Sequence, residues 1–321
     1  MKNQTYRRLL FFAFFTFLGS SFHPLIWAQN KESFLALNTS RQSRTALSKN
    51  SQVVDSDLAG ENVSEAYRLV WHDEFDQGAK PDTSLWNYEQ GFVRNKELQW
   101  YQSDNAFVRD GYLHLIARRE QLTNPNFKPD AKSWREQRRV AHYTSASIHT
   151  KGKFSFKYGV LEVRAKIDTA MGLWPAIWTL GLERPWPEKG EVDLMEFYRI
   201  NGEAHILANA AWGSAKAYTP IWDSEKIPLR HFLDQKADWA EHFHIWKMVW
   251  TEDRIALYLD DELLNEIDLT KVYNADGSQV FHQEQYILLN LAIGQQGGDP
   301  SSTSFPKTYL VDYVRVYQKR D

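Results

Sequence analysis

The most constraining stretch of this chain is residues 190–198, where three carboxylates interrupt an apolar run that reads G-E-V-D-L-M-E-F-Y. The aliphatic and aromatic residues of this run predict a buried strand. Burying a carboxylate costs free energy unless the group is paired or takes part in chemistry. We therefore expect Glu191, Asp193 and Glu196 to belong to a functional site built on a sheet.

The period of a strand decides which of these acids can meet. Side chains alternate between faces, so Glu191 and Asp193 share one face and Glu196 would point to the other. One extra residue after Asp193, a β-bulge, would turn Glu196 back beside them. Two glutamates would then flank one groove, as a retaining glycosidase requires: one attacks the anomeric carbon and the other protonates the leaving oxygen. Asp193 would hydrogen-bond the nucleophile and help to separate the two glutamate pKa values.

The alternative is an acidic strand whose carboxylates lie in solvent or in salt bridges, because a six-residue pattern can arise by chance. The sequence just upstream favours catalysis. Residues 172–181 read G-L-W-P-A-I-W-T-L-G, with Trp174 and Trp178 four positions apart. Tryptophan faces stack on the apolar faces of sugar rings, and aromatic rings beside convergent acids are typical of a binding site. We expect both tryptophans to position sugars.

The motifs G-E-V-D-L-M-E and L-W-P-A-I-W together resemble glycoside hydrolase family 16. The resemblance covers roughly residues 67–318, and the spacing from Asp193 to Glu196 is similar to the laminarinase and agarase branch of the family. It implies a β-sandwich jelly roll with a concave substrate cleft. It also implies that Glu191 is the nucleophile, Asp193 its helper and Glu196 the acid/base.

Three segments organise the chain. A basic start, a short apolar run and small residues predict a signal peptide over residues 1–28, and the polar residues 29–66 predict a disordered linker. Residues 67–321 remain as the catalytic domain, and their alternating strand patterns with few helical signals predict an all-β sandwich or barrel. The protein is therefore expected to be secreted or periplasmic. A retained membrane anchor is the alternative.

The cysteine content and net charge of the chain limit the kinds of partner that we expect. The chain contains no cysteine, which excludes disulfides and bacterial lipid attachment at the signal cleavage site. Its formal net charge of −3 favours neither nucleic acid nor an anionic membrane. We expect a monomer that acts on a polysaccharide and does not stay inserted in a membrane once the signal is removed.

The family resemblance extends to further site residues. The run N-K-E-L-Q-W-Y is similar to the segment that lines the glycone end of the cleft, which implies that Asn95 and Trp100 contact sugar. Burial of Trp100 in the core is the alternative. The segment A-A-W-G places Trp212 at an aromatic cleft position. Two positions depart from the family: Ser147 stands where laminarinases usually carry arginine, and Ala211 where they often carry histidine near the cleaved bond.

Hydrolysis by paired carboxylates requires no metal. The resemblance nevertheless implies one structural Ca²⁺ at Glu74, Gly111 and Asp312, an empty site being the alternative. Residues 218–240 resemble an insertion that either binds extra sugar rings or covers part of the cleft. Residues 128–139 form a basic loop, either solvated or in contact with a sulfated or acidic polysaccharide.

The sequence thus predicts a secreted, retaining endo-β-glycanase for β-1,3-glucan or mixed β-1,3/1,4-glucan. One alternative is an endo-hydrolase of a marine galactan of the agar, porphyran or carrageenan type, which the departures at Ser147 and Ala211 and the basic loop would favour. A transglycosylase with the same intermediate is another. The third is a non-catalytic glucan-binding protein on the same fold, although this chain keeps all three acids.

Overall fold

The computed structural model of this protein describes residues 66–216 and 218–320. The predicted signal peptide and all but the last residue of the predicted linker lie outside the described residues, so these two assignments stay predictions. In the described part of the chain, no helix is long and apolar enough to cross a membrane.

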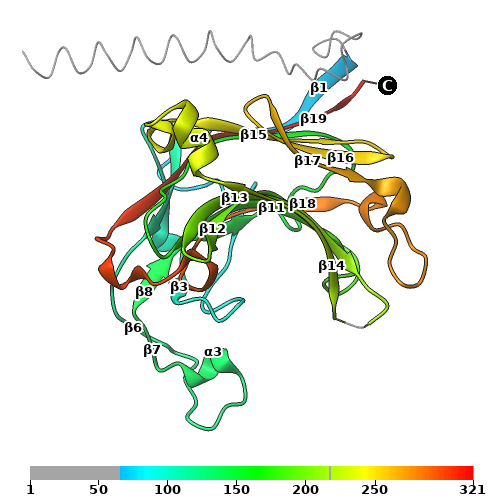
Figure 1. The fold of residues 1–321 in the computed structure, drawn as a ribbon. Helices are drawn as coiled ribbons and strands as arrows, with labels where there is room; N and C mark the ends of the chain where they lie inside the picture. The colour runs from blue at the N-terminus through cyan, green and yellow to red at the C-terminus, as the bar shows by residue number, and fades with distance from the viewer. Residues whose placement is uncertain (1–65, 217, 321) are drawn as a thin grey trace, which may run out of the picture. The chain divides into compact units, whose positions relative to one another are not determined.

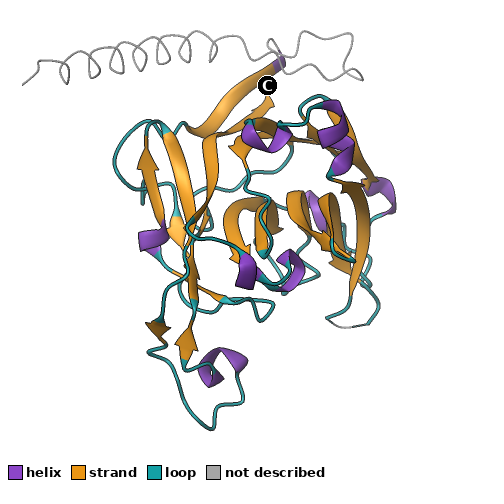
Figure 2. Ribbon diagram, turned by 60° about the vertical axis from the view of Figure 1, so that its left-hand side comes forward, coloured by secondary structure: helices purple, strands orange, loops and turns teal. Residues whose placement is uncertain are grey.

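The described residues form an antiparallel β-sandwich, and strands far outnumber the few short helices (Figures 1 and 2). The first sheet has the order β17-β16-β15-β10-β19-β5-β4, and β1 also pairs with β19. Its strands are β1 (Tyr67–Asp73), β4 (Ala106–Arg109), β5 (Tyr112–Ala117), β10 (Gly159–Lys166), β15 (His244–Trp250), β16 (Arg254–Leu259), β17 (Glu262–Asp268) and β19 (Lys307–Lys319). The predicted all-β sandwich is confirmed.

The second sheet has the order β14-β13-β12-β11-β18-β9-β2. Its strands are β2 (Asn87–Tyr88), β9 (Ser147–His149), β11 (Leu173–Gly181), β12 (Glu191–Ile200), β13 (Glu203–Gly213), β14 (Pro220–Pro228) and β18 (Gln285–Ile293). Two short pairs complete the strands: β3 (Gln99–Tyr101) with β8 (Tyr143–Ser145), and β6 (Leu122–Thr123) with β7 (Val140–Ala141).

The helical segments are all short. Within residues 66–216 and 218–320, two are α-helical, α3 (Trp134–Gln137) and α4 (Arg230–Gln235). The 3-10 turns are Ser103–Asn105, Trp239–Glu241, Leu269–Lys271, Val280–His282, Gln295–Gly297 and Pro300–Ser302.

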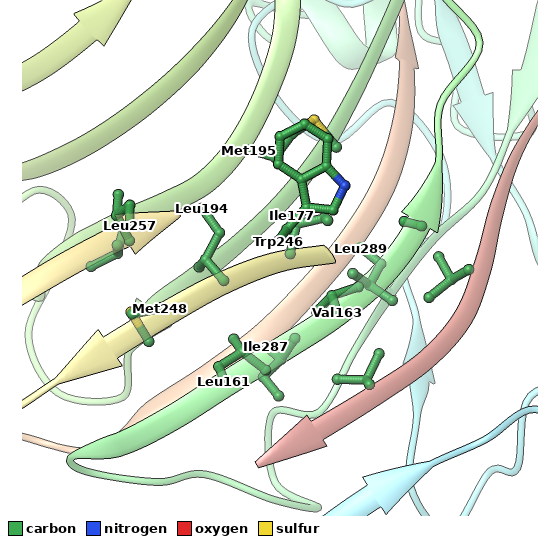
Figure 3. Close-up of a cluster of buried hydrophobic side chains, with 14 of the residues drawn as sticks. Leu161, Val163, Ile177, Leu194, Met195, Trp246, Met248, Leu257, Ile287 and Leu289 are labelled. Carbon is green, nitrogen blue, oxygen red and sulfur yellow. The ribbon is translucent and has the colours of Figure 1, made fainter. Parts of the chain in front are cut away.

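Alternating apolar side chains of the two sheets meet between them and form the main core. Leu161 and Val163 of β10 and Trp246 of β15 come from the first sheet, while Ile177 of β11 and Ile287 of β18 come from the second (Figure 3). All five are fully buried. This core leaves the opposite face of the second sheet free for other chemistry, and we call it the outer face.

The register around β12 contains the predicted β-bulge. On the β11 side, Trp178 pairs with Asp193 and the adjacent Ile177 pairs with Met195, so Leu194 is the extra residue. The register with β13 shifts at the same point. Both Leu194 and Met195 are fully buried in the main core (Figure 3). Two consecutive residues of the strand therefore point into the core, and Glu196 returns to the outer face.

Two segments expected to be loops have defined structure. Residues 220–228, within the expected insertion, form β14 and extend the second sheet beyond β13. In the basic loop, Arg135 donates to the carbonyl of Val93 and Arg138 to the carbonyl of Glu97, while Lys128 pairs with Glu136. These three cations thus bind groups of the chain itself.

Candidate active site

The structure brings the three predicted acids together on the outer face. Asn209 lies opposite Asp193 on β13, and its amide Nδ2 donates to Asp193 Oδ2 at 3.2 Å and to Glu196 Oε2 at 2.9 Å. Asp193 also hydrogen-bonds Glu191. The carboxyl groups therefore form one connected cluster, which requires the bulge, since an unbroken strand would have turned Glu196 into the core.

Glu196 is held from both neighbouring strands. Its Oε1 accepts a hydrogen bond of 2.9 Å from the indole Nε1 of Trp174 on β11. On the other side, Ser224 of β14 donates to Asn209 Oδ1, which leaves the amide nitrogen of Asn209 directed at the carboxyls. Asn209 and Ser224 were not predicted as site residues, because only the register of β13 and β14 places them beside Glu196.

Glu191 is held by a loop. Its Oε2 accepts a hydrogen bond of 2.8 Å from the indole Nε1 of Trp186, whose side chain is 39% exposed. Trp186 was also missed, although it precedes the acidic strand in the run W-P-E-K-G-E. The loop of residues 182–190 puts a second indole donor on the outer face, so each glutamate has its own tryptophan.

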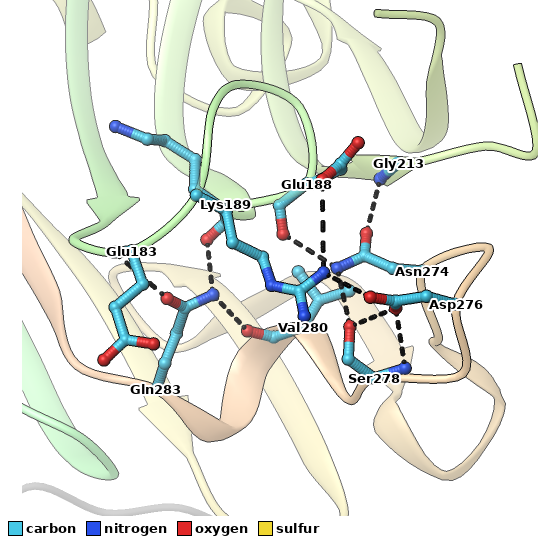
Figure 4. Close-up of polar contacts among 10 residues, drawn as sticks. Glu183, Glu188, Lys189, Gly213, Asn274, Asp276, Ser278, Val280 and Gln283 are labelled. Carbon is cyan, nitrogen blue, oxygen red and sulfur yellow. Dashed lines mark hydrogen bonds and ion pairs between the residues drawn. The ribbon is translucent and has the colours of Figure 1, made fainter. Parts of the chain in front are cut away.

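Contacts with the segment 273–283 fix this loop (Figure 4). Asn274 accepts from the backbone nitrogen of Gly213 at 3.0 Å and donates to the carbonyl of Glu188 at 2.9 Å. Gln283 donates to the carbonyl of Lys189 at 3.0 Å. The position of Trp186 therefore depends on side chains that follow it by about ninety residues.

The electrostatic surroundings of the two glutamates differ. Burial raises the pKa of Glu191 to about 7, although Trp186, Arg94 and Lys189 oppose the rise. Burial, and then the charge of Glu191, raise the pKa of Glu196 to about 7. The cations near Glu191 lower the pKa of its carboxyl group, while the charge of Glu191 raises the pKa of Glu196, so this asymmetry favours charge on Glu191 and a proton on Glu196. The pKa of Asp193 is raised well above its usual range by burial and then by the charges of Glu196 and Glu191, which favours its protonated form as the donor to Glu191.

Of the predicted sugar platforms, Trp174 lies beside the acids and Trp178 does not offer an open ring. Trp174 is partly exposed and packs edge-on against Tyr198 at 5.9 Å between ring centroids. Trp178 is only 8% exposed, and the guanidinium of Arg94 lies 5.1 Å from its ring centroid. A side chain from a distant loop therefore covers the ring of Trp178 in this arrangement, and stacking of Trp178 on sugar stays a prediction.

The strand register contradicts the expected cleft position of Trp212, for a reason of parity. Ala211 pairs with Glu191 across β12 and β13, so Ala211 faces the site. Trp212, the next residue, points to the opposite face and packs against the main core. The expected replacement of histidine by Ala211 near the cleaved bond agrees with this register, but the aromatic ring beside it is structural.

The segment at the predicted glycone end is mostly internal. Trp100 is buried and packs against Phe92 at 5.4 Å between centroids, where it lines a cavity of about 510 Å³ beneath residues 124–136. This matches the alternative of a packed Trp100. Asn95 is exposed, and its amide donates to Glu97 Oε1 at 3.3 Å. Sugar contact by Asn95 stays a prediction.

Ser147 stands where an arginine was expected, and another residue supplies a guanidinium group nearby. Ser147 donates to Glu89 Oε2 at 2.6 Å, and the same Glu89 oxygen pairs with Arg94. A guanidinium group therefore does lie at this end of the outer face. It comes from residue 94 and not from β9.

The carboxylates of the predicted calcium site are engaged by arginine. Glu74 binds Arg315 through both of its oxygens, at 2.9 and 2.8 Å, and Asp312 pairs with Arg164. As arranged, Glu74, Gly111 and Asp312 do not fit a Ca²⁺ ion, because an ion would have to displace the guanidinium groups. Calcium binding at these residues stays a prediction.

A β-sandwich that carries two partly buried glutamates with raised pKa values, each hydrogen-bonded by its own indole, has the site of a glycoside hydrolase. The comparisons with known proteins agree. The family model described as "Glycosyl hydrolases family 16" matches residues 92–315. The chain belongs to this family.

Three matches show the extent of the similarity. Glucan endo-1,3-beta-glucosidase A1 of Niallia circulans is 31% identical over 83% of this chain, which spans 39% of that protein. The laminarinase catalytic domain of Thermotoga maritima is 32% identical, with a TM-score of 0.66 over 80% of this chain and 100% of that domain. A structure from work on endo-acting O-glycanases of the human gut microbiota that initiate mucin breakdown is 31% identical, with a TM-score of 0.72 over 79% of this chain and 92% of its own.

The raised carboxyl pKa values predict a pH-dependent gain in stability for Glu196→Gln. A carboxyl group whose folded pKa lies above its unfolded pKa makes the protein less stable as pH rises between the two values, here from about 4.5 to about 7. Glutamine does not titrate. In urea unfolding, the free energy of unfolding of Glu196→Gln relative to wild type should rise by on the order of 2 kcal/mol from pH 5 to pH 8.

Glu225→Gln, at an exposed glutamate of β14, is the matched control and should show no such trend. A difference between Glu196→Gln and wild type that stays constant from pH 5 to pH 8 would contradict the electrostatic account.

Proposed function

We propose that this protein is a secreted, retaining endo-β-glucanase that hydrolyses β-1,3-glucan or mixed β-1,3/1,4-glucan. The observation that carries the proposal is the pair of glutamates on the outer face, one near cations and the other next to the first one's charge. The names of the Niallia and Thermotoga relatives support a glucan as substrate. Secretion rests on the signal-like residues 1–28.

In the first step of the proposed reaction, ionised Glu191 attacks the anomeric carbon and forms a glycosyl ester. The bond from that carbon to the leaving oxygen breaks, and Glu196 gives its proton to this oxygen. Asp193 and Trp186 donate hydrogen bonds to Glu191 and hold its carboxylate in position before the attack.

In the second step, Glu196, now ionised, takes a proton from water, and the resulting hydroxide oxygen bonds to the anomeric carbon. The ester bond to Glu191 breaks and its carboxylate is restored. Trp174 and Asn209 hydrogen-bond Glu196 and stabilise the ionised form that this step needs. Two displacements at one carbon retain its configuration.

The galactan alternative loses part of its support. It rested on the absence of an arginine at Ser147, on Ala211 and on the basic loop. Arg94 supplies a guanidinium beside Ser147's partner Glu89, and cations of the basic loop bind the chain itself. Ala211 still departs from the expected laminarinase pattern, and no contact among the described residues compensates for it.

The two indole donors should control opposite limbs of the pH–activity profile. Trp186→Phe removes a hydrogen bond that lowers the pKa of Glu191, so that pKa rises and the acidic limb should move to higher pH. Trp174→Phe removes one that lowers the pKa of Glu196, so the alkaline limb should move to higher pH. Each shift should be about one pH unit in kcat/KM, since hydrogen bonds to charged groups contribute about 1.5–3 kcal/mol.

Each variant serves as the control for the other. If both substitutions moved the same limb, or if the limbs exchanged between them, the assignment of nucleophile and acid would be wrong.

The substrate is tested by product analysis of the purified protein on laminarin, barley mixed-linkage glucan, agarose, porphyran and κ-carrageenan. We expect a series of oligosaccharides from laminarin or barley glucan, and no products from Glu191→Gln. Products from a galactan alone would replace the substrate assignment. Absence of products from every polysaccharide would overturn the proposed function.

A further inference from the structure

Trp222 is a large exposed aromatic residue on the same sheet face as the acids. It lies on β14, where it pairs with Ala211 of β13, and Ala211 pairs with Glu191 of β12. Residues directly opposite in antiparallel strands share a face. Glu191, Ala211 and Trp222 therefore form one row across three strands, with Trp222 about 10 Å from Glu191 by two strand spacings.

The contacts of its neighbours confirm which way Trp222 faces. Ser224, two residues along β14, donates to Asn209, which binds Glu196. Asp223, between them, accepts a hydrogen bond of 2.9 Å from Asn265 on β17 of the first sheet. Even-numbered residues of this part of β14 thus face the outer side, and odd-numbered residues face the core side.

Two features leave the indole available to a ligand. The side chain of Trp222 is 45% exposed, which leaves a large apolar area in water that a bound ring could bury. Between Trp222 and Glu191 the row contains only Ala211, which is fully buried beneath its neighbours, so no large side chain of that row separates the indole from the nucleophile.

The edge of the sheet offers a different occupant, a strand from another protein, since β14 is the last strand in its sheet. Charged side chains disfavour such pairing, and β14 carries exposed Glu225 and Lys226. The continuity of Trp222 with the acidic cluster instead favours the molecule that the acids act on. A pyranose ring has an apolar face that stacks on indole.

We propose that Trp222 is a stacking platform for a sugar ring of the polysaccharide, one that lies on the β14 side of the ring attacked by Glu191. The inference rests on the proposed glycosidase function and adds a binding position to it. The sugar chain crosses β13 over Ala211 and reaches Trp222, so substrates long enough to cover β14 gain affinity that short substrates do not.

The test compares a polymer with a minimal substrate. For laminarin, Trp222→Ala should lower kcat/KM about tenfold, mainly through KM, as expected for one lost aromatic stacking contact. For 4-nitrophenyl β-laminaribioside, which is too short to cover β14, kcat/KM should stay within about twofold of wild type. Trp222→Phe keeps an aromatic ring and should recover most of the activity on laminarin.

Ile221→Ala is the matched control, because Ile221 is the adjacent residue, is 42% exposed and faces the other side of β14. It should leave both substrates unaffected. Equal losses on both substrates for Trp222→Ala, no loss on laminarin, or an equal loss for Ile221→Ala would each overturn the proposal. So would a Trp222→Ala variant that changes the sedimentation coefficient but not the kinetics, because Trp222 would then belong to a protein interface.

Affinity electrophoresis separates a failure of this inference from a failure of the proposed function. Gels containing each of the five polysaccharides measure binding without turnover. If wild type cleaves none of them, the glucanase function fails, while retardation of wild type but not of Trp222→Ala in one gel still supports the platform. Equal retardation of both proteins in every gel would overturn the platform alone.

Discussion

One extra residue in β12 is the constraint on which the site depends. Leu194 and Met195 both enter the core, and this shift returns Glu196 to the face that carries Glu191 and Asp193. Without the bulge, the strand would place a carboxylate in the apolar interior, where its burial would be costly. The bulge therefore determines both the stability of β12 and the presence of two glutamates in one site.

Burial of the carboxyl groups raises their pKa values, as the proposed reaction needs, but it also lowers the stability of the fold. Burial and mutual repulsion raise the pKa values of all three carboxyl groups, and the neighbours of each group oppose or add to that rise. Arg94 and Lys189 favour charge on Glu191, and that charge raises the pKa of Glu196. The chain has no cysteine and hence no disulfide to offset this cost in stability. The large core between the two sheets must therefore offset it.

The sequence pattern of residues 190–198 was sufficient to predict the strand, the bulge and the three acids. The alternation of side chains along one strand can be followed without knowing which strands pair with it. The pattern did not show that Arg94, from a loop more than eighty residues earlier, covers the ring of Trp178. It missed Trp186 and Asn209 because their contacts depend on loop closure and cross-strand register. Trp212 could have been corrected from sequence alone: if Ala211 faces the site, the next residue of the strand must face away.

The most direct test of the account is to trap the intermediate with a 2-deoxy-2-fluoro β-laminaribiosyl fluoride, whose enzyme ester hydrolyses slowly. Cleavage after Lys189 and Arg199 gives a peptide of residues 190–199 that contains both glutamates, so fragmentation by mass spectrometry must locate the sugar. The account predicts a single modification on Glu191. A sugar on Glu196, or no covalent adduct together with products of inverted configuration, would contradict it.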